Sequence, residues 1–153
     1  MKVLVVYYST YGNVYKMSQA VAEGVRKVPG AEPVVRRVKE LIPDSVVESR
    51  EDMRRGRDMQ KDVPLVAKDD FRQADAVIFG TPTRFGNVSA QLKNQIDQLT
   101  ELWLKGELEG KPAGVFVSTG SLHGGQESLT MRHLGLIATY LLFARRERSN
   151  EKD

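Results

Sequence analysis

The sequence of 153 residues contains no cysteine. This absence excludes a disulfide framework, a zinc site with thiolate ligands, an iron–sulfur cluster held by this chain and a cysteine nucleophile. Any redox chemistry therefore depends on a bound cofactor. No catalytic acid–base dyad is visible either, and we predict no metal site.

Long apolar runs are also lacking. Residues 134–144 form an apolar stretch about half as long as the roughly 20 residues that a membrane helix needs, so we assign it to the core. The chain starts directly in a strand pattern, without the charged leader, apolar segment and cleavage site of a signal peptide. We therefore expect a cytoplasmic protein.

Neither charge dominates the chain. The net charge is +3, and Lys and Arg are interleaved with Asp and Glu. Two small basic groups are more typical of solvated surface than of a nucleic-acid site: Arg36, Arg37 and Lys39, and Arg145, Arg146 and Arg148. With 41% hydrophobic residues, the composition is that of one globular domain, which we expect to span residues 1–153.

Strand and helix patterns alternate along the chain. Residues 3–8, 33–38, 75–80 and 112–118 read as strands, and the first is apolar enough to be buried on both faces. A helix is expected from Val14, with Pro29 and Gly30 ending it. A second is expected over residues 89–104, with one face formed by Leu92, Ile96, Leu99 and Trp103. This alternation predicts a doubly wound parallel sheet in a three-layer α/β sandwich.

Two segments interrupt this pattern. Residues 41–70 form a charged insertion, helical in part, for which a solvated helix on the rim is favoured over a partner-binding arm. Residues 128–153 form an atypical C-terminal segment. Within it, residues 136–143 continue a helix or form a fifth strand, with helix slightly favoured, and residues 145–153 are expected to fray.

Two polar turns follow buried strands and precede helices. They are Ser9-Thr10-Tyr11-Gly12-Asn13-Val14 and Thr81-Pro82-Thr83-Arg84-Phe85-Gly86. Ligands of open α/β sheets bind beyond the carboxyl ends of the strands. A flavin-sized site between these turns is therefore the first hypothesis.

The first turn suits a phosphate. Ser9, Thr10 and Asn13 lead into a helix whose free N–H groups attract anions, and Gly12 permits close approach and positive φ. The spacing of nucleoside triphosphate and dinucleotide motifs is absent, which favours a single phosphomonoester. An ordinary capped strand-to-helix turn explains this loop about equally well.

The second turn is longer than a bare connection requires. It places Phe85 to face a ring and Arg84 to donate to ring carbonyls. A third loop of hydroxyl groups and glycines, Ser118 to Glu127, follows the fourth strand. Three loops at one sheet edge form a pocket.

Several sequence motifs, including parts of these three loops, resemble those of a known protein family. The motifs span about the first 127 residues and are Val-Val-Tyr-Tyr-Ser-Thr-Tyr-Gly-Asn at 5–13, Ala-Val-Ala-Glu-Gly at 20–24, Phe-Gly-Thr-Pro-Thr-Arg-Phe-Gly-Asn at 79–87, Leu-Trp at 102–103, and Ser-Thr-Gly followed by Gly-Gly-Gln-Glu at 118–127. The chain resembles the flavodoxin-like NAD(P)H:quinone oxidoreductases of the WrbA family. The resemblance implies a flavodoxin-like sheet of strand order 2-1-3-4, with a fifth strand in doubt.

The resemblance also implies a non-covalent FMN. Its phosphate is expected on Ser9, Thr10, Tyr11, Gly12, Asn13 and Val14, its isoalloxazine beside Thr83, Arg84 and Phe85, and its ribityl chain and ring edge near Ser118, Thr119, Gly120, Ser121, Leu122, His123 and Gly124. Tyr11 matches a nicotinamide-nucleotide contact. Trp103 matches a residue lining the substrate space, with core packing equally plausible from its helical position.

The activity implied is two-electron, ping-pong transfer of hydride from NAD(P)H through the flavin to a quinone. His123 is a candidate to orient substrate or shuttle a proton, although a surface role is more common for a lone loop histidine. The alternatives are a flavodoxin-like electron carrier for a protein partner and a non-enzymatic fragment.

After Glu127 the family pattern is not recognisable. Truncation, a frameshift or divergence would each explain this, and each predicts an exposed fourth strand, weakened FMN affinity and doubt about the family's homotetramer.

Overall fold

The computed structural model of the chain describes residues 1–130. The helix or fifth strand expected over residues 136–143 and the frayed tail expected over residues 145–153 lie outside the described residues.

Four parallel strands form the sheet. In spatial order they are β2 (Glu32–Arg37), β1 (Lys2–Tyr7), β3 (Ala76–Arg84) and β5 (Ala113–Ser118). β5 is the fourth strand expected from the sequence, so the predicted order 2-1-3-4 is confirmed. Within residues 1–130, β5 pairs only with β3, and all six of its residues are partly exposed.

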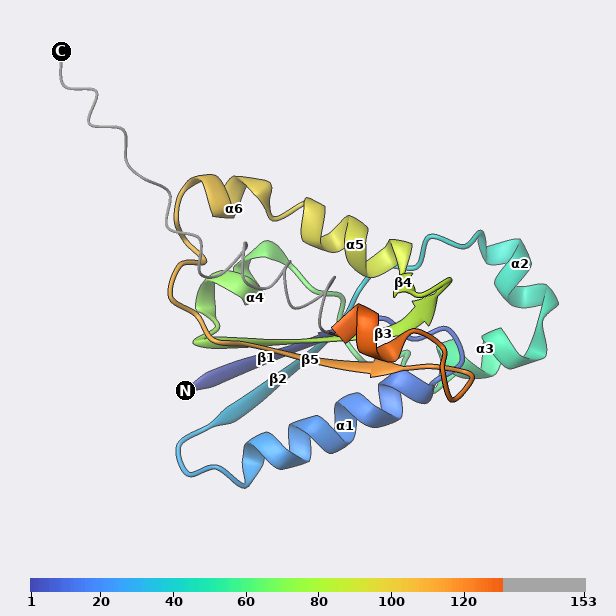
Figure 1. Cartoon of the computed structure of the whole chain (residues 1–153), viewed down its shortest axis with the longest axis horizontal. Coiled ribbons are helices and arrows are strands. Elements are labelled where there is room, and N and C mark those ends of the chain that lie inside the picture. Colours follow the sequence, from blue (N-terminus) through green and yellow to red (C-terminus); the bar gives the residue numbers. More distant parts are fainter. Residues whose placement is uncertain (131–153) are drawn as a thin grey trace, which may run out of the picture.

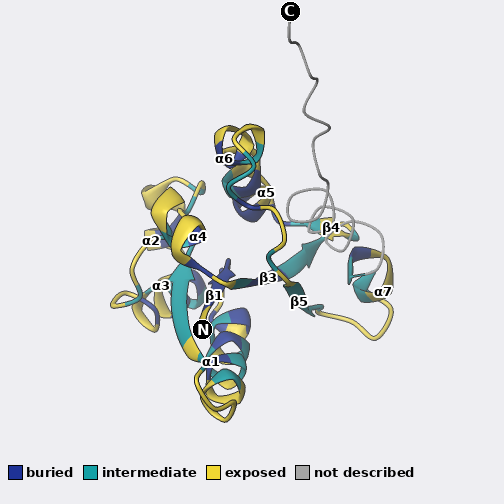
Figure 2. Ribbon diagram, turned by 90° about the vertical axis from the view of Figure 1, so that its left-hand side faces the viewer, coloured by how far each residue is buried: buried dark blue, intermediate teal, exposed yellow. Residues whose placement is uncertain are grey.

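Helices cover both faces of the sheet (Figures 1 and 2). α1 (Asn13–Arg26) packs on one face, and α4 (Lys68–Gln73), α5 (Ala90–Asp97) and α6 (Thr100–Leu104) lie on the other. Alternate residues of β1 serve the two faces: Leu4 and Val6 join the core under α5, whereas Tyr7 lies 6.1 Å from the ring of Tyr15 on α1. The apolar run thus supplies both halves of the sandwich, as expected for a central strand.

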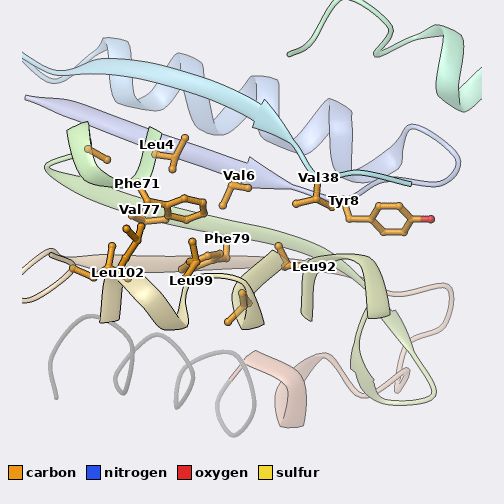
Figure 3. Packing of buried hydrophobic residues seen from close by; sticks show 13 residues of the cluster. Leu4, Val6, Tyr8, Val38, Phe71, Val77, Phe79, Leu92, Leu99 and Leu102 are labelled. Carbon is orange, nitrogen blue, oxygen red and sulfur yellow. The ribbon is translucent and has the colours of Figure 1, made fainter. Parts of the chain in front are cut away.

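The main core lies between the sheet and the α4–α6 layer (Figure 3). Side chains from β1, β3 and these helices interlock there. Phe71 and Phe79 are stacked 6.4 Å apart. The Tyr8 ring lies at the carboxyl end of this core, and its hydroxyl points away from the apolar cluster (Figure 3).

The helix expected over residues 89–104 is two helices. α5 ends at Asp97, and the Leu99 amide donates to the Ile96 carbonyl at 2.9 Å, a tighter turn than an α-helix makes. This turn shifts the buried face, so that Leu102 is fully buried and Trp103 is only half-buried. Leu92, Ile96 and Leu99 of the expected apolar face are buried, and Trp103 continues this face only in part.

The second polar turn is a β-hairpin rather than a strand-to-helix loop. β3 continues to Arg84, and β4 (Asn87–Val88) pairs with its end in antiparallel register. Phe85 and Gly86 form the tip with φ values of 53° and 76°, as two-residue hairpin turns require. The helix α5 begins only after this hairpin, with Ser89 as its N-cap.

The insertion contains α2 (Asp44–Ser49) and α3 (Glu51–Asp58), as the prediction of partial helicity anticipated. Both lie beyond the carboxyl end of the sheet (Figure 1). The short helix α7 (Gln126–Ser128) follows the third loop. Within residues 1–130, no helix is long and apolar enough to cross a membrane.

Candidate functional site

Three loops meet at the carboxyl ends of β1, β3 and β5 around a cavity of about 170 Å³. Ten of the predicted site residues line it, together with Pro82 of the second turn, which was not among the predicted cofactor contacts. The ten are Ser9, Thr10, Tyr11, Asn13, Val14, Thr83, Arg84, Ser118, Thr119 and Gly120. The three segments, far apart in the sequence, therefore share one site.

The first loop has the properties of an anion site. Ser9 is 6% exposed, and its hydroxyl has no hydrogen-bond partner within the described part of the chain. Gly12 is the N-cap of α1 with φ 87°, and no side chain caps the free N–H groups of this helix end. An unpaired buried hydroxyl beside an uncapped helix N-terminus fits a bound phosphate.

Helix α3 of the insertion packs on this loop. The Gln60 side chain, just beyond α3, donates from Nε2 to the carbonyl of Ser9 at 2.7 Å and to that of Gly56 at 2.9 Å. A Cβ on Gly56 would lie 2.3 Å from the Thr10 carbonyl oxygen. The favoured interpretation of the insertion as a solvated rim helix is therefore incomplete, because its inner face is part of the loop's support.

Met59 adds to this contact. A Cβ on Gly12 would lie 2.9 Å from its sulfur, so the left-handed glycine also makes room for the insertion. Sequence reasoning missed Gly56, Met59 and Gln60. The available signal was a glycine inside an otherwise charged helix, since glycine there lowers helix stability unless close packing requires it.

Arg84 joins the hairpin to the first loop. Its Nη2 donates to Thr10 Oγ1 at 2.7 Å, and its Nη1 donates to the carbonyl of Thr83 at 3.0 Å. The Thr10 hydroxyl donates in turn to the Tyr8 hydroxyl at 3.1 Å. Burial raises the pKa of Tyr8 above its ordinary value, and the Glu40 carboxylate raises it further. Tyr8 is therefore a protonated donor at neutral pH.

A second cavity of about 350 Å³ lies between the first loop, the end of β2 and the insertion. It shares Ser9 and Thr10 with the first cavity. Its walls combine apolar side chains such as Val47 and Met53 with charged groups of both signs. The Ser9-Thr10 dipeptide thus separates two hollows at the same end of the sheet.

Phe85 does not reach the 170 Å³ cavity. Its side chain stands fully exposed at the hairpin tip, beside an open depression of about 620 Å³ formed with Arg84 and Gln91. The left-handed backbone at Phe85 directs the chain into the hairpin rather than into a helix. The expected position facing a ring is not occupied in this structure.

The third loop contributes only its first part. Ser118, Thr119 and Gly120 line the cavity, whereas Ser121, Leu122, His123 and Gly124 do not. Leu122 is 87% exposed, and His123 lies on the surface.

The end of this loop touches the hairpin. A Cβ on Gly125 would lie 2.8 Å from the Gly86 Cα, which places the two loops in close contact. The third loop is therefore anchored at both ends, with an exposed segment between them.

Trp103 is not brought to the site. It lies on α6, which is joined to α4 by the ion pair Lys68–Glu101 at 2.8 Å. Both helices lie at the opposite end of the sheet from the three loops (Figure 1). Trp103 lines none of the three cavities described here. Within a single chain, it is remote from the expected substrate space.

Solved structures share this fold. A flavodoxin, WrbA-like protein from Agrobacterium tumefaciens aligns with a TM-score of 0.65 at 27% identity, over 93% of this chain and 74% of that protein. A flavodoxin from the domain Archaea aligns with a TM-score of 0.63 at 19% identity, over 96% of this chain and 79% of that protein. The flavodoxin-like fold predicted from the sequence is confirmed.

Curated relatives are more similar in sequence. The NAD(P)H dehydrogenase (quinone) of Aromatoleum aromaticum is 46% identical over 143 residues, which cover 90% of this chain and 69% of the relative. That of Geobacter sulfurreducens is 45% identical over 150 residues, covering 94% of this chain and 73% of the relative.

The model of the NADPH-dependent FMN reductase family matches residues 1–141. This match continues beyond Glu127, where the recognised motifs end, and so includes part of the atypical C-terminal segment, residues 128–153. The chain belongs to the NADPH-dependent FMN reductase family, and the resemblance to flavodoxin-like NAD(P)H:quinone oxidoreductases is confirmed.

Proposed function

We propose that this chain is an FMN-dependent NAD(P)H:quinone oxidoreductase. One observation carries the proposal beyond family membership: the buried, unpartnered hydroxyl of Ser9 lies beside the uncapped N-terminus of α1. A phosphomonoester supplies the charge and the acceptors that this arrangement lacks. The names of the curated relatives support the same activity.

Different residues around the cavity would bind different parts of the cofactor. Ser9 to Val14 would hold the phosphate of FMN through backbone N–H groups and hydroxyls. Thr83 and Arg84 would lie beside the isoalloxazine, with Arg84 supplying a positive charge. Ser118, Thr119 and Gly120 would contact the ribityl chain. Phe85 and residues 121–124 are proposed contacts that require the exposed loop tips to close on the ligand.

When bound, FMN supplies the capacity to accept a hydride and to pass two electrons onward. The chain binds and orients the reactants. Among residues 1–130, no carboxylate and no imidazole lines the 170 Å³ cavity. The described part of the site thus contributes hydrogen-bond donors and one guanidinium, rather than an acid–base pair.

Tyr11 is the proposed contact for the nicotinamide nucleotide. The residue is 40% exposed at the rim of the cavity, where a second planar molecule has access. Trp103 can line a quinone site only if another subunit presents it, since α6 is remote from the loops. We therefore retain the homotetramer as a proposal, together with a cytoplasmic location. Mass in solution tests the tetramer.

Anaerobic reduction tests the activity. Purified protein is loaded with FMN, mixed with NADH or NADPH, and followed by the loss of flavin absorbance; a quinone is then added. Bleaching by a nucleotide and recovery with the quinone are expected. A flavin that binds but reacts with neither nucleotide would instead identify an electron carrier, and failure to bind FMN would identify a non-enzymatic fragment.

A further inference from the structure

A row of hydrogen bonds runs from the cavity into the interior. It starts at the Arg84 guanidinium, which donates to Thr10 Oγ1 at 2.7 Å, and continues as Thr10 donates to the Tyr8 hydroxyl at 3.1 Å. Tyr8 donates to the Glu40 carboxylate, with its hydroxyl 2.9 Å and 3.0 Å from the two oxygens. Four residues from three separate segments thus connect a cation at the site to an anion behind it.

The charges at the two ends determine which group donates and which accepts in each hydrogen bond of this row. Arg84 can only donate, and ionised Glu40 can only accept. Each hydroxyl between them must therefore donate toward Glu40. This ordering leaves a lone pair of Thr10 Oγ1 directed at Arg84, so the acceptor that holds the guanidinium depends on a carboxylate two hydroxyls away.

Glu40 itself is held firmly. Its Oε1 accepts from the backbone amides of Leu41 at 2.8 Å and Ile42 at 3.0 Å, and from Gln91 Nε2 on α5 at 2.9 Å. With Tyr8, this makes four donors around one carboxylate. Charge-assisted hydrogen bonds of this kind are about twice as strong as neutral ones. These hydrogen bonds therefore fix the position of the Glu40 carboxylate at the end of the row.

The middle of the row is shielded from solvent. Tyr8 is 3% exposed and Thr10 is 7% exposed. Both residues border the 350 Å³ cavity, yet little of either is exposed, and hydrogen bonds in such surroundings are costly to leave unmade. Loss of the Glu40 carboxylate would therefore disturb Tyr8 and Thr10.

We propose that Glu40 is a positioning residue that acts through Tyr8 and Thr10 to hold the Arg84 guanidinium at the cofactor site. The proposal rests on the proposed function only in placing Arg84 beside FMN. Among residues 1–130, the hydrogen bonds of Glu40 lead to the residues expected to contact FMN only through this row. A purely structural role, tying the loop after β2 to α5 through Gln91, predicts effects on stability that do not depend on Arg84.

A double-mutant cycle separates the two roles. FMN dissociation constants are measured by flavin fluorescence for the unaltered protein, Glu40→Ala, Arg84→Ala and the double variant. We expect about 10-fold weaker binding for each single variant, the loss of one hydrogen bond to a charged group. The double variant should bind like Arg84→Ala. Losses that multiply would overturn the proposal.

Two further variants guard against a general loss of folding. Glu40→Gln keeps an oxygen acceptor for Tyr8 and should restore affinity to within about threefold of the unaltered protein, a difference below 1 kcal/mol. Tyr8→Phe keeps the ring but removes the hydroxyl, and should weaken FMN as Glu40→Ala does. Glu48→Ala is the matched control, because this exposed carboxylate of the insertion pairs only with Arg57 among the described residues.

A measurement without FMN keeps this inference independent of the proposed function. The Nε–Hε NMR signal of Arg84 is assigned from its absence in Arg84→Ala. Glu40→Ala and Tyr8→Phe should shift it, while Glu48→Ala should not. A protein that fails to bind FMN but shows these shifts would refute the proposed function and support the row. An Arg84 signal unmoved by Glu40→Ala would refute the row.

Discussion

The first and third loops of the candidate site have similar compositions and different structures. Ser9 and Thr10 are buried beneath α3, with the Ser9 carbonyl bonded to Gln60. Leu122 and His123 are exposed, and their segment is held by hydrogen bonds within the loop, such as Thr119 Oγ1 to the Ser121 carbonyl at 2.8 Å. With similar residue types, the first loop is thus held by contacts with α3, whereas the exposed part of the third loop is held largely by hydrogen bonds within the loop.

This difference separates two ways of binding a ligand. A loop already held in its binding geometry loses little conformational entropy when the ligand arrives, whereas exposed side chains must be ordered at that moment. The first loop should therefore supply affinity through fixed geometry. The exposed part of the third loop should add less, and only in the bound state. Substitutions at the first loop and its support should therefore affect FMN affinity more than substitutions in the exposed part of the third loop.

Gly56→Ala should have the largest effect. The added Cβ would lie 2.3 Å from the Thr10 carbonyl oxygen and 2.7 Å from the Tyr11 Cα, both backbone atoms that cannot move aside cheaply. Overpacking of this severity costs about 3 kcal/mol, outweighing the roughly 1 kcal/mol that alanine gains over glycine in a helix. The net loss of about 2 kcal/mol should lower the melting temperature by about 4–8 °C, and FMN binding should weaken.

Gly24→Ala is the matched control for this change. Gly24 lies in α1, and nothing is within 4 Å of its Cβ position. Alanine there should raise stability by about 0.5–1 kcal/mol. Equal responses of the two glycines to substitution would show that α3 does not press on the first loop.

Gln60→Leu should rank second. It removes both donors to the Ser9 and Gly56 carbonyls and leaves these acceptors buried. An unsatisfied buried acceptor costs about 1–3 kcal/mol, so thermal unfolding should show a loss of about 2 kcal/mol together with weaker FMN binding. Gln98→Leu, at an exposed position, should leave both quantities nearly unchanged. A destabilised protein with unaltered FMN affinity would show that the contact between Gln60 and the first loop stabilises the fold but does not contribute to FMN binding.

Ser9→Ala should have a small effect of opposite sign. In the FMN-free protein it removes a buried hydroxyl that has no described partner, so stability should rise by about 0.5–1 kcal/mol. Affinity for FMN should nevertheless fall by about 10-fold, the loss of a hydrogen bond to a charged phosphate.

Ser18→Ala tests the reverse case. The Ser18 hydroxyl is buried on α1 and already donates to the Tyr15 carbonyl at 2.7 Å. Its loss should lower stability and leave FMN affinity unchanged. If Ser9→Ala also destabilised the FMN-free protein, its hydroxyl would have a structural partner and the anion site would lose its main support.

Much of the fold was predictable because it depends on local pattern. The β-branched run of β1 identified the central strand, and the alternation of strands and helices identified the parallel sheet. The break between α5 and α6 was not predictable. It depends on one tightened turn at Leu99, and a window average over apolar spacing does not register such a turn.

The site was predictable only where its residues follow strand ends. Parallel strands bring their carboxyl ends to one edge, so Ser9, Thr83 and Ser118 were expected to converge. The bond from Arg84 to Thr10 joins residues 74 positions apart and depends on the hairpin. The hairpin was hidden because Phe85, rather than glycine or asparagine, occupies a left-handed position in its turn. Gly56 was hidden by the charges around it.

Leu122→Ser should have the smallest effect on the FMN-free protein. The side chain is 87% exposed, so its loss should leave the melting temperature within about 1–2 °C, as for most surface substitutions. Val28→Ser, at an exposed apolar residue remote from the loops, is the control for both measurements. If the third loop closes on FMN, Leu122→Ser should also weaken binding by about fivefold, the loss of about 1 kcal/mol of apolar burial. Unchanged affinity would restrict the site to the loops after β1 and β3 and to the first residues after β5. A clear loss of stability without FMN would instead mean that the third loop, like the first, is held by the fold, and the contrast between the two loops would disappear.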